Sequence, residues 1–287
     1  MLPTMPTKPS VAIVGPGRLG TALALQLTRA GYRISEIVSR TPASARKVRA
    51  LTQTLKARSS HYQNVSLDAG LIWLCVPDRE IAVVAGDLAA LKIWKGKTVF
   101  HSSGALDSDT LGALRKCGAK VASVHPMMTF VRGAVPTMKG ITFALEGDGA
   151  AVRLAQRIVR DFGARTFLIL KRNKAAYHAW GAFTSPLLVA ALVTAEQVAR
   201  SAGLKTTEAR RMMLPIVAQT FVNYAALGPA ASFSGPLVRG DAETVCKHLQ
   251  ALKTIPEARA VYVALARSAL HHLPVENRRQ LAKLLKV

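Results

Sequence analysis

Cysteine, aromatic residues and acidic residues are all scarce in this sequence of 287 residues. The three cysteines, Cys75, Cys117 and Cys246, are far apart and form no Cys-x-x-Cys pair. This spacing excludes a disulfide-stapled scaffold and a zinc site built on such pairs, and the seven histidines also lack the spacing of metal ligands. We therefore expect reduced thiols, a cytoplasmic location and no bound metal.

Acidic residues are strongly outnumbered, with 16 aspartates and glutamates against 39 lysines and arginines, so the formal net charge is +23. The chain has 23 basic and 10 acidic residues up to Leu170, and 16 and 6 after it, so the excess is not concentrated in one segment. Nucleic-acid-binding proteins usually gather positive charge on one stripe or arm, sometimes beside aromatic residues, which make up only 6% here. A nucleic-acid partner is therefore not favoured, and this basic protein suits small anionic ligands such as a phosphorylated cofactor.

Segments able to enter a membrane are also few. The opening MLPTMPTKPS is polar and lacks the apolar core of a signal peptide, so we predict no secretory signal. The run Ala179–Ala195 is uncharged, but its 17 residues include Pro186 and reach only the short limit of a spanning helix. We predict instead a helix buried in a second domain or in a dimer interface, and no membrane partner.

Short apolar runs alternate with helical patterns up to about residue 170. Seven runs are predicted as strands: Val11–Val14, Ile34–Val38, Leu71–Val76, Thr98–Phe100, Val121–Val124, Ile141–Leu145 and Thr166–Leu170. Strand, crossover helix and strand in this order predict an α/β fold with a doubly wound, mostly parallel sheet of the Rossmann type.

Only helical patterns follow Lys171. They cover Lys174–Ala202 with an interruption at Pro186, then Thr206–Leu227, Asp241–Leu252, Pro256–His271 and Glu276–Leu285. We predict a dinucleotide-binding Rossmann domain over residues 1–172 and an all-helical substrate and dimerisation domain over residues 173–287.

The motif GPGRLG, which begins at Gly15, matches the pattern Gly-x-Gly-x-x-Gly between a strand and a helix. In a dinucleotide-binding turn, Gly15 makes the tight bend, Gly17 lets the backbone approach a pyrophosphate, and Gly20 lets the helix pack on the strand. The amides of Arg18, Leu19 and Gly20 would then face the phosphates. The alternative is a sharp turn that binds no ligand.

The second strand ends in Ser39 and Arg40, where NAD-binding domains carry an acidic residue about 20 residues after the glycines. Glu36 comes too early, within the strand. An arginine at this position can bind a 2′-phosphate through its planar guanidinium. We therefore predict that Ser39 and Arg40 bind NADP(H) rather than NAD(H), the alternative for Arg40 being an ordinary surface charge.

Polar residues follow the later strands, at the edge where parallel sheets bind their ligands. Val76, Pro77 and Ser102 are expected to contact the cofactor. Ser103 is a candidate to hydrogen-bond a substrate, and His125 is a candidate general acid or base because an ordinary imidazole titrates near neutral pH. For Ser102 and Ser103 a purely structural role in the turn remains open.

Two neighbours of these residues have simpler explanations. Asp78 follows a proline and is expected to cap the next helix, and His101 ends a strand and is expected to be structural.

In the helical half, Lys174, His178 and Ser185 fall on one face of the long helix, with Tyr177 beside them. Polar groups on an apolar helix should face a cavity or a partner, so Lys174 and His178 become catalytic candidates.

A second polar motif, SGPLVRGD, frames Arg239 between two glycines and a proline and ends in Asp241. Arg239 could clamp a carboxylate or phosphate, and both residues are candidates for substrate binding. The alternatives are a surface salt bridge for Arg239 and a helix N-cap for Asp241.

Together, the segments GPGRLG, LCVPD, HSSGAL, SVHPMMTF, KAAYHAW and SGPLVRGDAETVCKHL resemble bacterial Rossmann-like proteins with a helical C-terminal domain of unknown function 2520. That family is named for NADP oxidoreductase activity through its relation to pyrroline-5-carboxylate reductase and the coenzyme-F420-dependent NADP reductase. The resemblance runs from Val11 to about Leu273 and implies the fold and the cofactor more than the reaction.

Two wider resemblances imply roles for single residues. Prephenate dehydrogenases carry a serine after a late strand and a histidine before a proline, in places similar to Ser103 and His125. The 3-hydroxyacid dehydrogenases carry a catalytic lysine early on the interdomain helix, at a place comparable to Lys174. This chain has Ser185-Pro186 where family members commonly have Ser-Asn, so a lysine–asparagine pair does not carry over.

Two functions follow from these observations. The first is an NADP(H)-dependent oxidoreductase that transfers a hydride to or from a C=O or C=N bond of a small anionic substrate, acting as a homodimer through its helical domain. The proton donor would be His125, Lys174 or His178. The second is a non-catalytic NADP-binding sensor or partner protein.

Overall fold

The chain forms two compact units, Met1–Ala182 and Phe183–Val287. The computed structural model describes residues 7–91, 94–131 and 134–286, so the first six residues of the polar N-terminal tail lie outside the described residues. Lys174, Tyr177 and His178 belong to the first unit, together with the glycine motif. The functional division of the chain after residue 172 stays a prediction.

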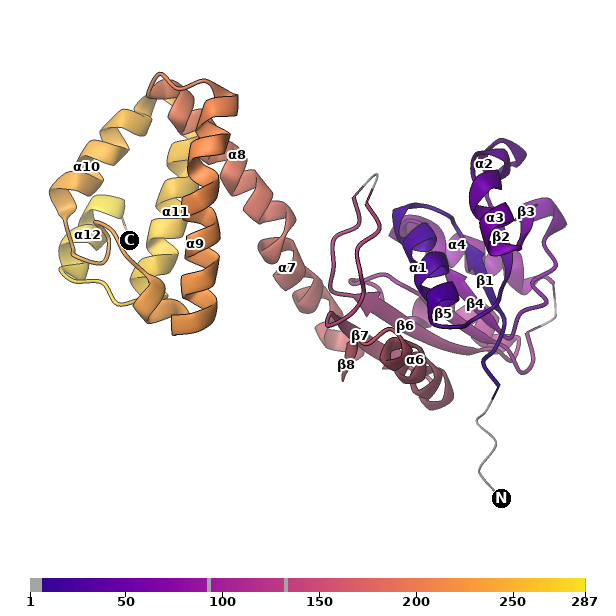
Figure 1. Cartoon of the computed structure of the whole chain (residues 1–287). Coiled ribbons are helices and arrows are strands. Elements are labelled where there is room, and N and C mark those ends of the chain that lie inside the picture. The colour runs from indigo at the N-terminus through magenta and orange to yellow at the C-terminus, as the bar shows by residue number, and fades with distance from the viewer. Residues whose placement is uncertain (1–6, 92–93, 132–133, 287) are drawn as a thin grey trace. The chain divides into compact units, whose positions relative to one another are not determined.

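The first unit is built on one eight-stranded sheet (Figure 1). Its strands are β1 (Val11–Val14), β2 (Ile34–Ser39), β3 (Arg58–His61), β4 (Leu71–Leu74), β5 (Thr98–His101), β6 (Lys120–Pro126), β7 (Thr142–Gly147) and β8 (Arg165–Leu168). They lie in the order β3-β2-β1-β4-β5-β6-β7-β8, and neighbouring strands are parallel except β6 and β7. The predicted doubly wound, mostly parallel sheet is confirmed, and its strand order reverses between β1 and β4.

Helices cover both faces of this sheet. Helices α1 (Arg18–Arg29) and α6 (Gly149–Asp161) pack on one face, and α4 (Asp78–Ala89) and α5 (Gly112–Lys116) pack on the other. Every residue of β1 and of β4 is buried, which explains why these strands read as continuous apolar runs rather than as alternating patterns.

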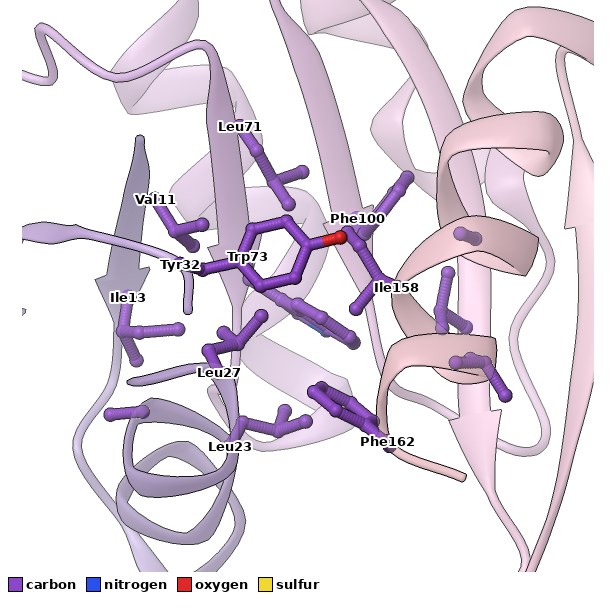
Figure 2. Packing of buried hydrophobic residues seen from close by; sticks show 14 of the residues in the cluster. Val11, Ile13, Leu23, Leu27, Tyr32, Leu71, Trp73, Phe100, Ile158 and Phe162 are labelled. Carbon is purple, nitrogen blue, oxygen red and sulfur yellow. The ribbon is translucent and has the colours of Figure 1, made fainter. Parts of the chain in front are cut away.

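Aromatic residues fill the core on the α1 and α6 face (Figure 2). Trp73 and Phe100 meet edge to face, with ring centroids 5.3 Å apart and an interplanar angle of 85°, and Leu27 and Ile158 belong to the same cluster. The indole Nε1 of Trp73 donates a hydrogen bond of 2.8 Å to Ser102 Oγ. The core therefore supports the loop that follows β5 directly.

Two local predictions were incomplete. Strand β3 was not predicted, because its sequence RSSH is polar and it lies at the edge of the sheet beside β2. The predicted helix over residues 43–55 is two helices, α2 (Pro42–Lys47) and α3 (Arg49–Leu55), which meet at Val48. Its φ of −102° and ψ of 13° interrupt the helical backbone there.

The helix predicted after residue 174 is interrupted at Pro186 as expected, and it forms α7 (Lys174–Thr184) and α8 (Pro186–Ser201). The break falls at Ser185, whose φ of −137° and ψ of −80° are not helical. Proline disfavours the helical conformation of the residue before it, so Pro186 begins α8 and ends α7.

The second unit is helical in all its described elements (Figure 1). Helices α9 (Thr206–Ser232), α10 (Ala242–Ala251), α11 (Pro256–His272) and α12 (Arg278–Leu285) follow α8. A small core joins α10, α11 and α12, with Val245, Leu270 and Leu281 at its centre. This confirms the predicted helical region after the sheet.

Candidate functional site

The turn requires glycine at two of the three motif positions, but not at the third. Gly15 has a φ of +94°, and a Cβ there would lie 2.8 Å from the carbonyl oxygen of Cys75. A Cβ on Gly20 would lie 2.2 Å from the carbonyl oxygen of Gly15. A Cβ on Gly17 would meet no described atom within 4 Å. A tight turn explains Gly15 and Gly20, but it does not explain Gly17, which borders open space.

The start of α1 beside Gly17 favours an anion. Gly17 is the N-cap residue and offers no side chain to the helix, and the first turn contains no acidic residue. The first amides of a helix have no intrahelical partner, and the helix dipole places partial positive charge there. The amides of Arg18 and Leu19 therefore suit a phosphate group.

A cleft of about 460 Å³ adjoins this turn, at the carboxyl ends of β1, β2 and β4. It is lined by Gly15, Pro16, Gly17, Ser39, Arg40, Ser44, Lys47, Val48, Tyr62, Cys75, Val76, Pro77, Arg79 and Glu80. Six of the predicted cofactor residues are in this set, whereas Arg18, Leu19, Gly20 and Ser102 do not line the cleft. Ser102 instead accepts the hydrogen bond from Trp73.

A buried polar atom in the cleft has no partner. The hydroxyl of Ser39 is buried, and among the described residues nothing hydrogen-bonds to it. An unpaired buried hydroxyl is unfavourable by about 1–3 kcal/mol, so a ligand that hydrogen-bonds to Ser39 is favoured here. The cleft thus fits a dinucleotide with hydroxyl and phosphate groups.

Three cationic side chains line the cleft, those of Arg40, Lys47 and Arg79, against one carboxylate, that of Glu80. Arg40 Nη1 lies 3.5 Å from Glu80 Oε1, but the Arg40 side chain is 70% exposed, so the pair contributes little and leaves the guanidinium available. Sequence reasoning missed Lys47 and Arg79. The signal for Lys47 was its position in the first helix after β2.

A second group of polar residues lies after β5, where His101 is fully buried. Its Nδ1 accepts a hydrogen bond from the Ser103 amide, and its Nε2 lies 3.0 Å from the carbonyl oxygen of Asp107. Burial, with a further effect of the Lys174 charge, lowers the pKa of His101 to about 4. His101 is therefore a neutral residue that shapes the loop, which agrees with the structural role expected from the sequence.

The hydroxyl of Ser103 is committed to this loop. It donates to Asp78 Oδ2 at 2.7 Å and accepts from the amides of Ala105 and Leu106. The predicted N-cap role of Asp78 is wrong, because Pro77 is the N-cap residue and the Asp78 carboxylate bonds to Ser103 instead. A contact between Ser103 and a substrate stays a prediction. It would require the hydroxyl to give up one of these hydrogen bonds for one to the substrate.

Lys174 is buried beneath the loop that contains Ser103. The residue is 1% exposed, and its ammonium donates to the carbonyl oxygen of Ser103 at 3.0 Å and to Ser123 Oγ. Burial lowers the pKa of Lys174 to about 8, although the carboxylates of Glu146 and Asp107 act in the opposite direction. The amine is therefore poised near neutral pH, but it is enclosed.

His125, at the end of β6, is the most central of the predicted catalytic residues. Its Nδ1 lies 2.8 Å from the hydroxyl oxygen of Tyr177. On its other side, a Cβ on Gly104 would lie 2.8 Å from His125 Nε2 and 2.6 Å from His178 Cδ2. The two histidine rings are 6.1 Å apart and nearly perpendicular. The fold thus brings His125, His178, Ser103 and Lys174 around one loop, and adds Tyr177.

An apolar hollow of about 500 Å³ lies next to Tyr177. It is lined by Met127, Gly140, Ile141, Thr142, Phe167 and Trp180. The Tyr177 ring contacts Phe167 and Trp180, with centroids 5.6 Å and 6.0 Å apart. No charged side chain lines this hollow in the described part of the chain.

The remaining predicted residues lie in the second unit. Asp241 caps α10, since its carboxylate accepts from the amide of Thr244 at 3.0 Å and from the Thr244 hydroxyl at 2.7 Å. Arg239 is exposed on the preceding turn, which is fixed by Gly240 at a φ of +64°. The N-cap alternative for Asp241 is confirmed, and substrate binding by Arg239 and Asp241 stays a prediction.

Comparisons with known proteins agree with this architecture. Residues 4–126 match the family model of a Rossmann-like domain, and residues 141–269 match the model of a domain of unknown function, DUF2520. No curated protein matches the chain.

Three solved structures are similar along nearly the whole chain. A provisionally assigned NADP oxidoreductase from Bacteroides fragilis is 23% identical, with a TM-score of 0.73, and the match covers 91% of this chain and 97% of that one. A protein from Thermotoga maritima is also 23% identical, with a TM-score of 0.71 and coverage of 96% and 100%. A reductive aminase from Aspergillus terreus, solved with NADPH and ethyl-5-oxohexanoate, is 17% identical, with a TM-score of 0.67 and coverage of 97% and 100%. At these identities the likeness establishes a shared fold.

Proposed function

We propose that this chain, which carries a Rossmann-like domain followed by a DUF2520 domain, is an NADP(H)-dependent oxidoreductase that acts on a C=O or C=N bond of a small substrate. The observation that carries the proposal is the open space at Gly17, beside uncapped helix amides and the unpaired hydroxyl of Ser39. The similar structures support it, since the Aspergillus terreus enzyme was solved with NADPH.

The residues of the cleft fit each part of the cofactor. Gly15 and Gly17, with the first amides of α1, would hold the pyrophosphate. Ser39 and Arg40 would hold the adenosine ribose and its 2′-phosphate, and Val76 with Pro77 would line the opposite wall. When bound, the nicotinamide supplies or accepts a hydride at the substrate carbon.

Cofactor preference is tested by calorimetric titration of the chain with NADPH and NADH. Loss of a charge-assisted contact is worth about 1.5–3 kcal/mol, so Arg40→Ala should weaken NADPH binding about tenfold to a hundredfold and leave NADH binding unchanged. Arg33→Ala is the matched control, because Arg33 is exposed just before β2, at the opposite end of that strand. Equal affinities of the wild type for both cofactors would refute the preference.

The chemistry is assigned to the residues around Gly104. His125 Nε2 and His178 Cδ2 both lie within 3 Å of the place where a Cβ on Gly104 would be, so the two imidazole rings meet at this loop and are the candidate proton donors to a substrate heteroatom. Lys174 and Ser103 are enclosed by their own hydrogen bonds, so their proposed part is to hold the loop in shape and to adjust the local charge. Proton transfer by either of them stays a prediction.

Two features bear on the substrate. The net charge of +23 favours an anionic compound, as the sequence predicts. The hollow beside Tyr177 is apolar and favours a cyclic or alkyl group at one end of the molecule. We therefore propose a small carbonyl or imine compound with an apolar body, and retain the anionic group as the finer proposal.

Turnover is tested by following NADPH oxidation with keto acids, matched neutral ketones and cyclic imines. His125→Ala should abolish the activity of any compound that is reduced, whereas His271→Ala, at an exposed position near the end of α11, should not change it. NADPH binding without reduction of any compound would refute catalysis. A ligand-dependent change in oligomeric state would then support the alternative, a non-catalytic NADP-binding sensor or partner protein.

We also propose a homodimer formed through the helical unit, because that unit exposes many large apolar side chains. They are Phe183 of α7, Leu187, Val189 and Val193 of α8, Met212, Leu214, Ile216, Phe221, Val222, Tyr224 and Leu227 of α9, and Val261 and Leu265 of α11. Patches of this kind mark an interface. Sedimentation should give a dimer for the wild type and a monomer for the double variant Ile216→Glu, Phe221→Glu. Val83→Glu, at an exposed apolar residue of α4, is the control that should stay dimeric.

A membrane is the competing explanation for this surface. The segment Lys171–Ser201 is long and apolar enough to cross one, and only 6% of its most apolar window is buried. However, α7 begins with Lys174 and Tyr177, whose side chains are buried in the first unit, and the 16 residues of α8 span about 24 Å, less than the ~30 Å of a hydrocarbon core. We therefore favour a second copy of the chain as the cover and a cytoplasmic location. Partition of the full chain into lipid vesicles would refute this.

A further inference from the structure

We propose that Tyr177 is a positioning residue that fixes the tautomer of His125, so that His125 presents a protonated Nε2 on the Gly104 side. The consequence for catalysis rests on the proposed function, whereas the tautomer itself does not. Neither residue's partner could be predicted from the sequence, since they are 52 positions apart.

The geometry gives the two nitrogens of His125 different neighbours. Nδ1 lies 2.8 Å from the Tyr177 hydroxyl oxygen, and the two rings are perpendicular with centroids 5.4 Å apart. Nε2 lies on the other side of the ring, next to the Cα of Gly104, where a side chain would collide with it. Gly104 is buried, and its lack of a side chain makes room for the imidazole rings of His125 and His178, while His125 itself is partly exposed.

Tyr177 is held in place independently of His125. Its side chain is buried, and its ring contacts Phe167 and Trp180. Its position on α7, one turn after the buried Lys174, fixes the direction of the hydroxyl. A rigid phenol is therefore presented to a histidine ring at the end of β6, where His125 is paired with Ala144 of β7.

The protonation states of His125 and Tyr177 decide which of the two groups donates the hydrogen bond between them. Burial lowers the pKa of His125 to about 4, and the charges of Lys174, His178 and His101 act in the same direction. Burial raises the pKa of Tyr177 to about 12. Both groups are therefore neutral at neutral pH, and the phenol O–H is the natural donor to an unprotonated imidazole nitrogen. Nδ1 accepts from Tyr177, and the ring proton remains on Nε2.

This arrangement selects what His125 can do. A neutral imidazole with its proton on Nε2 can donate a hydrogen bond from that nitrogen to a carbonyl oxygen or an imine nitrogen of a substrate. The other tautomer would present only a lone pair there. Tyr177 would thus orient His125 as an electrophilic hydrogen-bond donor in reduction, acting through the histidine rather than on the substrate.

The test is Tyr177→Phe, which removes the hydroxyl but retains the ring contacts with Phe167 and Trp180. Nitrogen-15 spectra of the cofactor-free chain, with His125→Asn used to assign the signals, should show a protonated Nε2 and an unprotonated Nδ1 in the wild type. In Tyr177→Phe the two nitrogens should shift toward a mixture of tautomers. With a reducible substrate, kcat should fall at least about tenfold, with the dissociation constant of NADPH unchanged.

The chain contains a matched control. In the second unit, His248 Nδ1 lies 3.1 Å from the Tyr262 hydroxyl oxygen, with perpendicular rings 5.8 Å apart. Tyr262→Phe makes the same chemical change and should leave kcat and the His125 signals unchanged.

Two results would overturn the proposal: a proton on Nδ1 of His125 in the wild type, or the same tautomer in Tyr177→Phe as in the wild type. Failure to find a substrate would count against the oxidoreductase proposal alone, because the spectra are recorded without cofactor.

Discussion

Replacement of the buried lysine should change how stability depends on pH. The folded-state pKa of Lys174 is about 8, below its ordinary value of 10.5, chiefly because the ammonium is buried. Between these two values the unfolded chain binds more protons than the folded chain, so the free energy of unfolding rises with pH. One pKa unit corresponds to about 1.4 kcal/mol, so Lys174 should add about 2 kcal/mol to stability between pH 7 and pH 9.5. Lys174→Met should lack this increase.

Urea unfolding of the wild type and of Lys174→Met at both pH values measures the effect. Other groups that titrate in this range, including Tyr32 and Tyr177, are common to both proteins and cancel in the difference. Loss of the hydrogen bonds of Lys174 lowers the stability of Lys174→Met at both pH values. The test is therefore the change in the free energy of unfolding between the two pH values. Lys247→Met, at an exposed lysine paired with Glu243, should behave as the wild type. A difference between the wild type and Lys174→Met that varies by less than about 0.5 kcal/mol between the two pH values would refute the assignment of the buried charge.

Three further predictions concern single residues of the site and its surroundings. The pKa of His125 is about 4 in the folded chain and 6.5 in the unfolded chain, so this residue makes the free energy of unfolding fall by about 2 kcal/mol between pH 7 and pH 5. In urea unfolding, His125→Asn should lack this part of the loss. Gly17→Ala should weaken NADPH binding in calorimetry with little change in the unfolding midpoint. Gly20→Ala should instead lower the midpoint, because its Cβ would lie 2.2 Å from a backbone oxygen. Equal midpoints for the two variants would contradict this. Asp241→Ala should lower the free energy of unfolding by about 1 kcal/mol through loss of the α10 cap and leave the dissociation constant of NADPH unchanged, and a weaker NADPH affinity would show that the residue does more than cap the helix.

Local sequence was sufficient for features that depend on neighbouring residues. The glycine motif lies between β1 and α1 as predicted, because a positive φ at Gly15 and close packing at Gly20 are requirements of a strand that turns directly into a helix. The apolar runs predicted most of the strands, because a sheet covered on both faces buries every residue of its central strands. The polar edge strand β3 has no such signal and was missed.

Contacts between distant segments could not be predicted in the same way. Lys174 and His125 were candidates because of their residue types, but nothing in the sequence indicated that the lysine would be enclosed between Ser103 and Ser123. The expected cap at Asp78 was wrong for the same reason, since its carboxylate bonds to a serine 25 residues away.

The sequence by itself therefore determined the doubly wound sheet, the position of the glycine turn and the basic end of β2, because these features follow from local periodicity and from the residue types at strand ends. Only the tertiary structure decided which polar groups are neutral, enclosed or accessible. Burial and hydrogen-bond partners set those properties, and they depend on which strand ends and helix faces come together. For His125 this difference is decisive. In the sequence His125 is an ordinary histidine before a proline, whereas in the fold it is a neutral ring with Tyr177 on one side and Gly104 on the other.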